Sequence, residues 1–443
     1  LVGSSVSNNI LAGCEKNCLV ARGGKCSSQA SGPYTFANNA AHSGETGWLA
    51  DAPDASCNGI THFTGYKLEM GVVTFFKSQN VLASNLLISD TKIGVVLNTG
   101  GITDDTTITL KDSRLIGLGL ASDPAAYWNK KECNDLVGTF ISVSTVGAKT
   151  IPPTTSQLPW YIVKSDHIWK ATYTITGVTF ENFDDALVAG CSANRAINTN
   201  PYASDSSAVT KLSNINHINV ANTNRIFFEN PNDAWIGLDD CGGWYCTGPK
   251  NIIVQDLDGS LFGQIASIIP LNKGVYNSRC TVDIPENAYI CPEVGWGVLT
   301  FESLDADALT RILSPINVTS ADGYRNDINN YMDHIWDGFY TGLKRLSRYH
   351  SIVETAKDYL VKFTSTVPNA LRWQLEGTLS PSDWVTAQYG YTTPQSVKVT
   401  DMEGKTINPK YIQAAGDSTG ISESDACGAN VYIVAERKLT LKL

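Results

Sequence analysis

The sequence is poor in charge, in methionine and in long apolar runs. Of its 443 residues only 17% are charged and 3 are methionine, and 43 acidic residues outnumber 33 basic ones. No basic stripe is present to neutralise phosphates, which excludes nucleic acid as an expected partner. No apolar run approaches the ~20 residues that a membrane helix requires. We therefore expect no membrane span in this chain.

The motifs of common catalytic and metal sites are missing too. The 6 histidines form no HxH or HExxH pair, and neither a phosphate-binding GxxxxGK[ST] nor a serine nucleophile elbow occurs. Acidic residues do come in close pairs, namely Asp104 with Asp105, Asp184 with Asp185, Asp239 with Asp240, and Asp256 with Asp258. Adjacent strand residues face opposite sides, so the first three pairs are poorly placed to cooperate. The sequence identifies no catalytic residue and no cofactor.

Cysteine is abundant for a cytosolic protein, at 11 residues. Disulfides formed in an oxidising compartment are the simplest explanation. We expect Cys241 to pair with Cys246, closing a small loop, and Cys280 to pair with Cys291. The odd number leaves one thiol free or bound outside the chain.

A single N-glycosylation sequon, at Asn317, is compatible with secretion. The opening LVGSSVSNN has neither the basic nor the apolar region of a signal peptide, so we interpret the chain as a processed product or as one piece of a longer precursor. Together these features predict a secreted glycoprotein.

What the sequence has is a loose repeat of short apolar segments, each with a small or polar residue just before or within it. The repeat is marked by Gly65, Asn85, Ser113 and Gly177. A period of roughly 20 to 30 residues is typical of solenoids, and it predicts a right-handed parallel β-helix. Its corner residues must accept left-handed or tight backbone angles. An antiparallel β-sandwich is the competing interpretation, but hairpin turns are missing between these segments.

The pattern divides the chain into four parts. Residues 1–57 form a cysteine-rich segment or incomplete first coils, and residues 58–291 form the β-helix, with an insertion at about 121–172. Residues 292–350 are an aromatic-rich connecting region. Residues 351–443 alternate apolar and polar residues, which predicts a small antiparallel, sandwich-like β domain.

The segment NIIVQDLDGSLFG, which contains Asp256 and Asp258, raises the question of a calcium site. An EF-hand loop counted from Asp256 is excluded, because the glycine is not at its sixth position and its twelfth residue is not glutamate. In a strand the two aspartates would share one face, Leu257 would point inward and Gly259 would open the corner. A structural corner is therefore favoured. A calcium site shared with Asp239 and Asp240 is the alternative.

The C-terminal run ANVYIVAERKLTLKL alternates strongly, with Leu439, Leu441 and Leu443 on one face. Such a strand is commonly the last strand of its own sheet. Alternatively it pairs with the edge of a neighbouring subunit, which would give self-association or filaments.

Several ordered blocks resemble the fibrocystin and fibrocystin-L family. They include THFTGYKLEMGVVTFF, NVLASNLLISDTKIGVVLNTGG, DDCGGWYCTGPKNIIVQDLDGSLFG, GVLTFESLDADALTRILSPINV and SVKVTDMEGKTINP. The resemblance runs from about residue 35 to 410 and implies a parallel β-helix. It also implies an extracellular cell-surface or ciliary location, since the family's members are such proteins. The family's hyaluronan-binding relatives keep a second function open.

The expected function is thus an extracellular structural or adhesive scaffold of the cell, ciliary or flagellar surface, possibly within a filament. The alternative is a β-helix protein that binds or cleaves polysaccharides of the hyaluronan type. A groove with paired acids and aromatics would favour that alternative.

Overall fold

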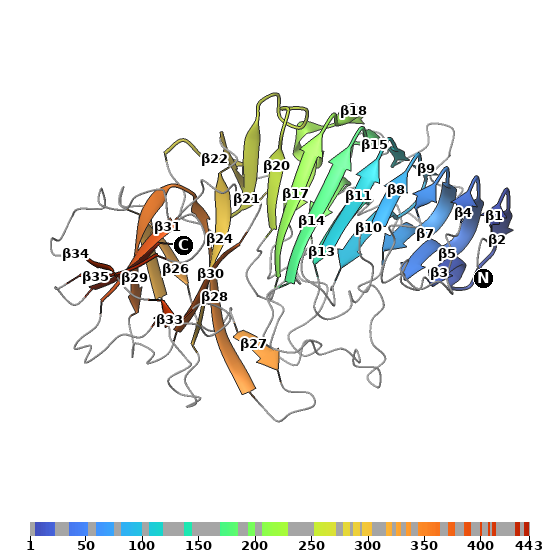
Figure 1. Ribbon diagram of the computed structural model, residues 1–443. Helices are drawn as coiled ribbons and strands as arrows, with labels where there is room; N and C mark the ends of the chain where they lie inside the picture. Colours follow the sequence, from blue (N-terminus) through green and yellow to red (C-terminus); the bar gives the residue numbers. More distant parts are fainter. Residues whose placement is uncertain are drawn as a thin grey trace. The chain divides into compact units, whose positions relative to one another are not determined.

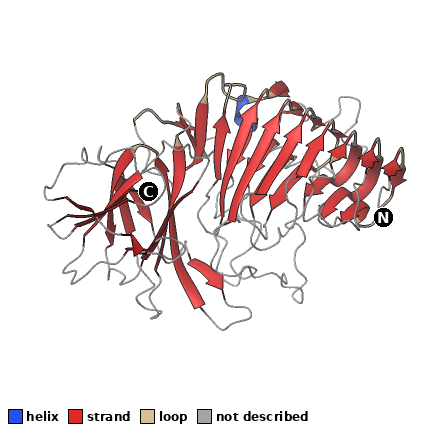
Figure 2. Ribbon diagram, in the orientation of Figure 1, coloured by secondary structure: helices blue, strands red, loops and turns tan. Residues whose placement is uncertain are grey.

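The computed structural model shows a chain built almost wholly of β-strands (Figure 1, Figure 2). In its described parts the helical structure is one 3-10 turn, η1 (Asn222–Asn224), and no helix there is long and apolar enough to cross a membrane. The described residues are 5–22, 35–51, 59–74, 81–99, 106–117, 137–143, 169–184, 194–199, 206–228, 252–271, 278–283, 287–292, 295–303, 316–320, 325–328, 334–337, 344–363, 371–376, 385–390, 399–400, 406–407, 410–412, 430–434 and 438–442.

The chain divides into two compact units. Unit 1 comprises Leu1–Pro270 and Thr281–Val294, and unit 2 comprises Leu271–Cys280 and Gly295–Leu443. Unit 1 contains the stacked coils, and unit 2 contains separate sheets.

The coils of unit 1 have three faces, and within each face neighbouring strands pair in parallel (Figure 1). The first face consists of β1 (Ser5–Ser7), β4 (Thr35–Ala37), β6 (Ile60–Thr61), β8 (Val81–Ser84), β11 (Thr106–Lys111), β14 (Trp169–Thr176), β17 (Ser206–Ser213) and β20 (Ile252–Asp256). The second face consists of β2 (Ile10–Ala12), β9 (Leu87–Ser89), β12 (Arg114–Ile116), β15 (Thr179–Phe183) and β18 (Asn216–Val220). The third face consists of β3 (Asn17–Arg22), β10 (Ile93–Thr99), β13 (Val137–Val143), β16 (Arg195–Thr199) and β19 (Ile226–Phe228). The longer strands β5 (Ala40–Asp51) and β7 (Thr64–Thr74) run through the second and third faces. Long parallel sheets of this kind are consistent with the predicted β-helix.

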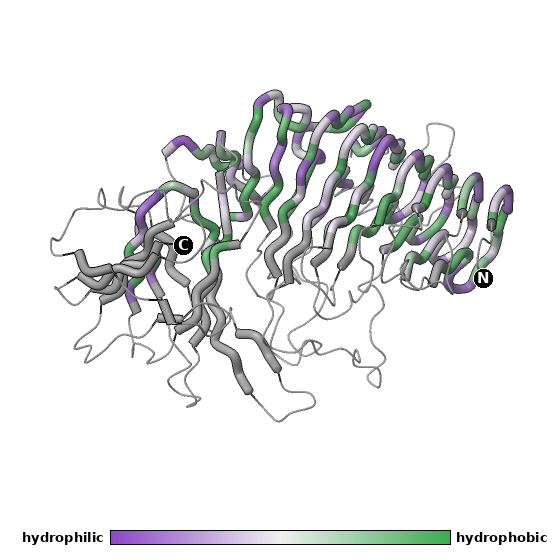
Figure 3. Tube along the Cα trace, viewed as in Figure 1, coloured by the Kyte–Doolittle hydropathy of each residue, from purple (hydrophilic) through white to green (hydrophobic). Residues whose placement is uncertain are grey.

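The hydrophobic core runs along the axis of the stack. Because the parallel strands are in register, each inward position lies above the same position of the next coil, and apolar residues recur along the described coils (Figure 3). One such inward row on the first face is Ile60, Ala83, Leu110, Ile175 and Leu212, all buried. Burial of these rows holds the coils together.

Two corners of the coil are built from residues in the left-handed conformation. The first corner, between the first and second faces, has Asn8, Asn38, His62, Asn85, Asp112, Gly177 and Asn214. The second corner has Gly13, Ser43, Lys67, Asp90, Asn182 and Asn219. Asparagine, aspartate and glycine tolerate this conformation best, so the local sequence determines where the chain turns.

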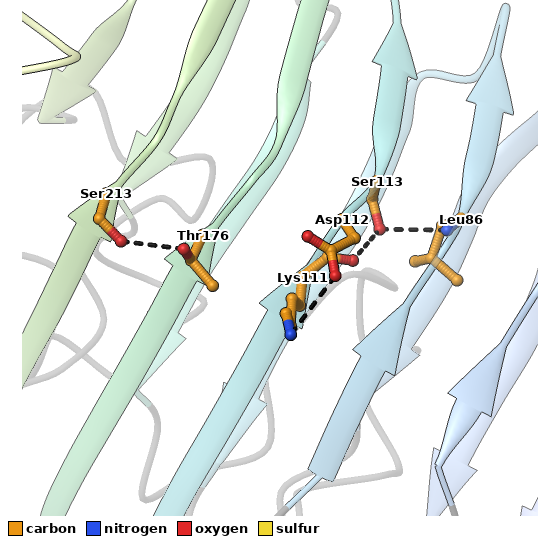
Figure 4. A network of polar contacts seen from close by, with 6 residues as sticks. All are labelled: Leu86, Lys111, Asp112, Ser113, Thr176 and Ser213. Carbon is orange, nitrogen blue, oxygen red and sulfur yellow. Dashed lines mark hydrogen bonds and ion pairs between the residues drawn. The ribbon is translucent and has the colours of Figure 1, made fainter.

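Polar contacts connect successive coils at the first corner (Figure 4). The Ser113 hydroxyl accepts a hydrogen bond from the Leu86 N–H at 3.1 Å and donates one to the Lys111 carbonyl at 2.7 Å. One corner further along, the Ser213 hydroxyl donates to Thr176 Oγ1 at 2.9 Å. These side chains satisfy polar groups where the backbone leaves the strands.

The predicted repeat placed the corners partly correctly. Asn85 and Gly177 do have positive φ at the first corner, at 54° and 65°. Gly65 instead pairs with Ile88 inside the second face, and Ser113 follows the corner residue Asp112. A Cβ at Gly65 would lie 3.2 Å from Phe63 and from Leu68, so crowding inside the coil explains this glycine. The small or polar residues of the repeat therefore mark two kinds of position, namely corners with positive φ and crowded positions inside the coil.

Two of the predicted segments contain strands of the coils. Within residues 1–57, β1 to β5 stack on the later coils, as the alternative of first coils predicted. Within the predicted insertion at 121–172, β13 lies between β10 and β16 of the third face, and β14 begins at Trp169 on the first face. These strands belong to the coils and not to an insertion. Residues 118–136 and 144–168 lie outside the described part.

Unit 2 contains a four-stranded antiparallel sheet and a seven-stranded mixed sheet. The first has the order β27 (His334–Asp337), β28 (Lys344–Glu354), β24 (Trp296–Ser303), β30 (Leu371–Glu376). The second has the order β26 (Arg325–Ile328), β25 (Ile316–Ser320), β29 (Lys357–Phe363), β31 (Val385–Gly390), β36 (Lys438–Lys442), β35 (Asn430–Val434), β34 (Lys410–Ile412), and a separate pair joins β32 (Val399–Thr400) to β33 (Thr406–Ile407). The β29–β31 and β34–β35 pairs are parallel.

The C-terminal strand β36 lies inside the seven-stranded sheet. It pairs antiparallel with β31 on one side and with β35 on the other. A strand that is paired on both sides offers no free edge. The predicted contact with a neighbouring subunit through this strand therefore needs correction, and the other expectation, a strand within its own sheet, describes β36.

Candidate functional site

The stack of coils ends where the chain reverses direction after β20. On one side β20 pairs in parallel with β17, and on the other it pairs antiparallel with β21 (Ala266–Pro270). The antiparallel strands β23 (Ala288–Cys291) and β22 (Thr281–Asp283) continue this edge. The turn between β20 and β21 contains the DLDG segment. We call residues 256–263 the closing turn.

Asp256 occupies an inward position of the first face. In the parallel register it lies next to Leu212, where the preceding coils have apolar residues, and its exposed fraction is 0%. Its Oδ2 accepts hydrogen bonds from the N–H groups of Leu261 at 2.9 Å and Phe262 at 3.2 Å. A buried carboxyl here satisfies backbone donors that would otherwise face the end of the core.

Asp258 and Ser260 connect the closing turn to the preceding coil. Asp258 Oδ2 accepts from the Asn214 N–H at 2.6 Å, and its Oδ1 accepts from the Ser260 N–H at 3.0 Å. The Ser260 hydroxyl accepts from the Ile215 N–H at 3.0 Å. In earlier coils the corner N–H donates to a backbone carbonyl of the next coil, so Asp258 takes the place of that carbonyl. Ser260 repeats the contact that the Ser113 hydroxyl makes with the Leu86 N–H.

Two further features shape the closing turn. Arg225 donates a hydrogen bond from Nη1 to the Leu261 carbonyl, while the Leu261 side chain is fully buried in the core. Gly259 has φ of +79°, and a Cβ there would lie 2.9 Å from the backbone nitrogen of Gln264. Only glycine satisfies both requirements without strain.

The pKa values of the two carboxyls of the closing turn are shifted in opposite directions. Burial raises the pKa of Asp256, and this outweighs the hydrogen bonds from Leu261 and Phe262, which lower it. Burial also acts to raise the pKa of Asp258, but hydrogen bonds from the Ser260 side chain and from the Asn214 and Ser260 N–H groups outweigh it and lower that pKa. The closing turn thus has one carboxyl whose pKa is raised and one whose pKa is lowered.

These positions correct one part of the interpretation of DLDG. Asp256 points inward and Leu257 is 40% exposed, the reverse of the predicted arrangement. The reason is the register with β17, which sets the inward row at Asp256. Gly259 opens the corner as predicted. Both aspartates accept backbone hydrogen bonds within a turn, which favours the structural corner.

The calcium alternative stays a prediction. Three of the four carboxylate oxygens of Asp256 and Asp258 accept backbone N–H groups, and Asp256 Oδ1 is buried without a hydrogen-bond partner. The expected co-ligands Asp239 and Asp240 lie outside the described residues. Within the described residues no group of three or more His, Cys, Asp or Glu side chains gathers as a metal site.

The other acidic pairs are only partly visible. Asp104 and Asp105 lie outside the described residues, as does Asp185, the neighbour of Asp184. The Asp256–Asp258 pair is wholly described, and there the carboxyls accept backbone N–H groups. These contacts are those of a turn, and the polysaccharide-cleaving alternative stays a prediction.

Disulfides occur in the described part of the chain, as the cysteine content predicted. Cys14 and Cys18 form one, at the junction of β2 and β3. Cys280 and Cys291 are both disulfide-bonded. Cys241 and Cys246 lie outside the described residues, so their pairing stays a prediction.

The sequon residue Asn317 lies in β25, between β26 and β29. Its exposed fraction is 7%, and its Oδ1 is buried without a hydrogen-bond partner. A glycan needs an accessible side-chain nitrogen, so this position argues against glycosylation of the folded chain. Glycosylation at Asn317 stays a prediction.

Sequence reasoning missed the partners of the closing turn. Asn214, Ile215 and Arg225 lie 33 to 44 residues before Asp258, and only the stacking of coils brings them to the closing turn. Sequence reasoning also did not single out His217, which is the last described residue of an inward row. It stacks near Phe180, with 6.1 Å between ring centroids, and its Nε2 is buried without a hydrogen-bond partner. Asparagine at a left-handed corner was the one signal that could have located this region.

The chain is similar to three curated proteins. Fibrocystin-L of Mus musculus is 25% identical over 433 residues, covering 84% of this chain and 10% of the relative. Fibrocystin-L of Homo sapiens is 30% identical over 240 residues, covering 45% and 6%. Fibrocystin of Canis lupus familiaris is 23% identical over 481 residues, covering 98% and 11%.

No protein-family model matches the chain. The chain spans about a tenth of the length of these curated relatives, or less. Two of the three matches cover most of the chain, and the parallel sheets agree with the β-helix that the sequence blocks implied. The homologues named fibrocystin-L and fibrocystin therefore support a fibrocystin-like family for this chain.

Proposed function

We propose that this chain is a structural or adhesive scaffold segment of an extracellular, cell-surface or ciliary protein. The observation that carries the proposal is the continuous stack of registered coils, with a core along its axis and a closing turn at its end. Such a stack resists bending because each coil is bound to both neighbours. The disulfide between Cys14 and Cys18 supports an oxidising location.

The architecture of the scaffold is part of this proposal. A right-handed sense of the coils is supported by the strong preference of parallel crossovers for that hand. A sandwich-like C-terminal domain is supported by the two sheets of unit 2, in which antiparallel pairs predominate. Both the hand of the coils and the C-terminal domain are proposed here as parts of a rigid spacer.

Electron microscopy of the purified native material, imaged with and without a chelator, tests the scaffold. Regular filaments that survive chelation are the expected result if the chain assembles. Dispersed particles that depolymerise acidic polysaccharides would overturn the scaffold and establish the polysaccharide-cleaving alternative. Filaments that dissolve on chelation would make Asp256 and Asp258 the first candidates for an ion site.

A contact between assembled copies would not use β36, because both of its edges are occupied. In the described part of the seven-stranded sheet the edge strands are β26 and β34. Charge substitutions on these two strands would show which of them takes part in assembly.

A further inference from the structure

His217 ends an inward row of the second face. In register, the row passes through Gly65, Ile88, Leu115 and Phe180 before it reaches His217, and the three apolar side chains among them are at most 1% exposed. The imidazole lies nearly parallel to the Phe180 ring, with 6.1 Å between the centroids, and its Nε2 is buried without a hydrogen-bond partner. A titratable ring thus occupies a position where earlier coils have glycine or an apolar side chain.

Arg225 connects this end of the stack with the closing turn. Its carbonyl accepts the Ile197 N–H at 3.1 Å, which fixes its backbone on the preceding coil. Its Nη1 donates to the Leu261 carbonyl, and its Nε is buried without a hydrogen-bond partner. The Leu261 N–H donates to Asp256 Oδ2, and the Leu261 side chain is fully buried. Arg225 therefore holds the closing turn at the residue that packs into the core.

Few charges surround His217. The turn η1, which follows β18, has no charged residue. The described charged residues of β15 with the residue after it, of the closing turn and of the start of β19 are Glu181, Asp184, Asp256, Asp258 and Arg225.

Arg225 is the charge that acts on His217. Glu181 pairs with Ile218 in the outward row, on the opposite face of the strand from His217, and forms an ion pair with Arg114. Burial first, and the positive charge of Arg225 second, lower the pKa of His217 from 6.5 to about 4. A proton on His217 therefore opposes the position of the Arg225 guanidinium.

We propose that Arg225 is an acid-sensitive latch on the closing turn, which holds Leu261 while His217 is neutral and releases it when His217 takes up a proton. Protonated His217 would be a buried cation with no acceptor for its Nε2–H and a second cation beside it, an arrangement that is strongly unfavourable. Movement of the two side chains into water relieves it. The Leu261 carbonyl then loses its donor, and the end of the core opens.

The pH range of the latch follows from the two pKa values of His217. An opened chain binds the proton with a pKa of 6.5 and the closed chain with a pKa of about 4, so opening becomes more favourable as the pH falls from 6.5 toward 4. At pH 5 the equilibrium constant for opening should be roughly 20 times its value at pH 7.

The aspartates of the closing turn do not produce this response. The pKa of Asp256 is raised, so its protonation stabilises the closed form as the pH falls, which is the opposite sign. The pKa of Asp258 is lowered from 3.8, so this carboxylate stays charged at pH 5.

Hydrogen exchange of the full chain at pH 7 and pH 5, corrected for the intrinsic rate at each pH, tests the latch. We expect the protection of Leu261 and Phe262 to fall by roughly 20-fold at pH 5, while β8 and β9 keep theirs. Equal protection of the closing turn at both pH values would overturn the proposal. An equal loss in all strands would overturn it too, because the chain would then unfold as a whole.

Two variants separate the sensor from the latch. His217→Phe keeps a ring on Phe180 without a titratable group, and it should abolish the response to pH; His217→Asn serves the same purpose if the first variant does not fold. Arg225→Gln keeps a donor for the Leu261 carbonyl but removes the charge, so β18 should still respond to pH while the closing turn does not. A response that persists in the His217 variants, or a closing turn that responds in Arg225→Gln as in the native chain, would refute the latch.

Discussion

Replacing Asp256 by alanine tests the closing turn most sharply. The carboxyl accepts the N–H groups of Leu261 and Phe262, and alanine leaves both donors without an acceptor at the end of the core. A buried donor left unsatisfied costs about 1–3 kcal/mol, so the two together cost about 2–6 kcal/mol. Alanine also removes the unfavourable burial that raises the pKa of Asp256, and this offsets part of the loss. We therefore expect a destabilisation of about 2–3 kcal/mol.

Native-state hydrogen exchange is the suitable assay, because coils in a solenoid are coupled mainly to their neighbours. Protection should fall in β20 and β21, less in β17, and stay unchanged in β8 and β9. Asp256→Asn is the matched control, since it keeps one oxygen for the two donors and should retain most of the protection. Wild-type exchange at Leu261 and Phe262 in the alanine variant would refute the reasoning.

Three other predictions concern the coils. Asp258→Ala should destabilise the last coils by only about 1 kcal/mol, because water can replace this exposed carboxylate. Since the pKa of Asp258 is lowered, the difference in stability between variant and wild type should be present above pH 3.8 and vanish as the pH falls. Identical denaturation curves of variant and wild type would contradict this prediction. Burial, aided by the charge of Arg225, lowers the pKa of His217 from 6.5 to about 4. The contribution of neutral His217 to the free energy of unfolding is therefore present above pH 6.5, and on the order of 3 kcal/mol is lost as the pH falls toward 4. His217→Phe should remove this slope from the pH dependence of melting. Asn85→Val should destabilise by roughly 1–2 kcal/mol because φ there is 54°, while Asn85→Gly should melt close to the wild type, and equal effects of the two would exclude the left-handed corner as the cause.

The closing turn illustrates where sequence reasoning stopped. Gly259 and the two aspartates indicate a turn locally, and the turn is present. Which of Asp256 and Leu257 points inward depends on the register between β20 and β17, and a shift by one residue exchanges the two faces of a strand. The partner of Asp258, the Asn214 N–H, lies 44 residues earlier in the chain. No local pattern encodes that distance.

The sequence by itself determined the β class, the stacked short strands, the presence of disulfides and the fibrocystin-like resemblance. These follow from alternation, from corner residues that tolerate positive φ and from ordered sequence blocks, all of which are local or additive signals. Only the tertiary structure decided that β13 belongs to the coils, that β36 is enclosed by two neighbours and that the first face ends in antiparallel strands after β20. Each of these depends on which distant strands pair, and pairing is settled by the burial of whole rows along the stack rather than by any single segment.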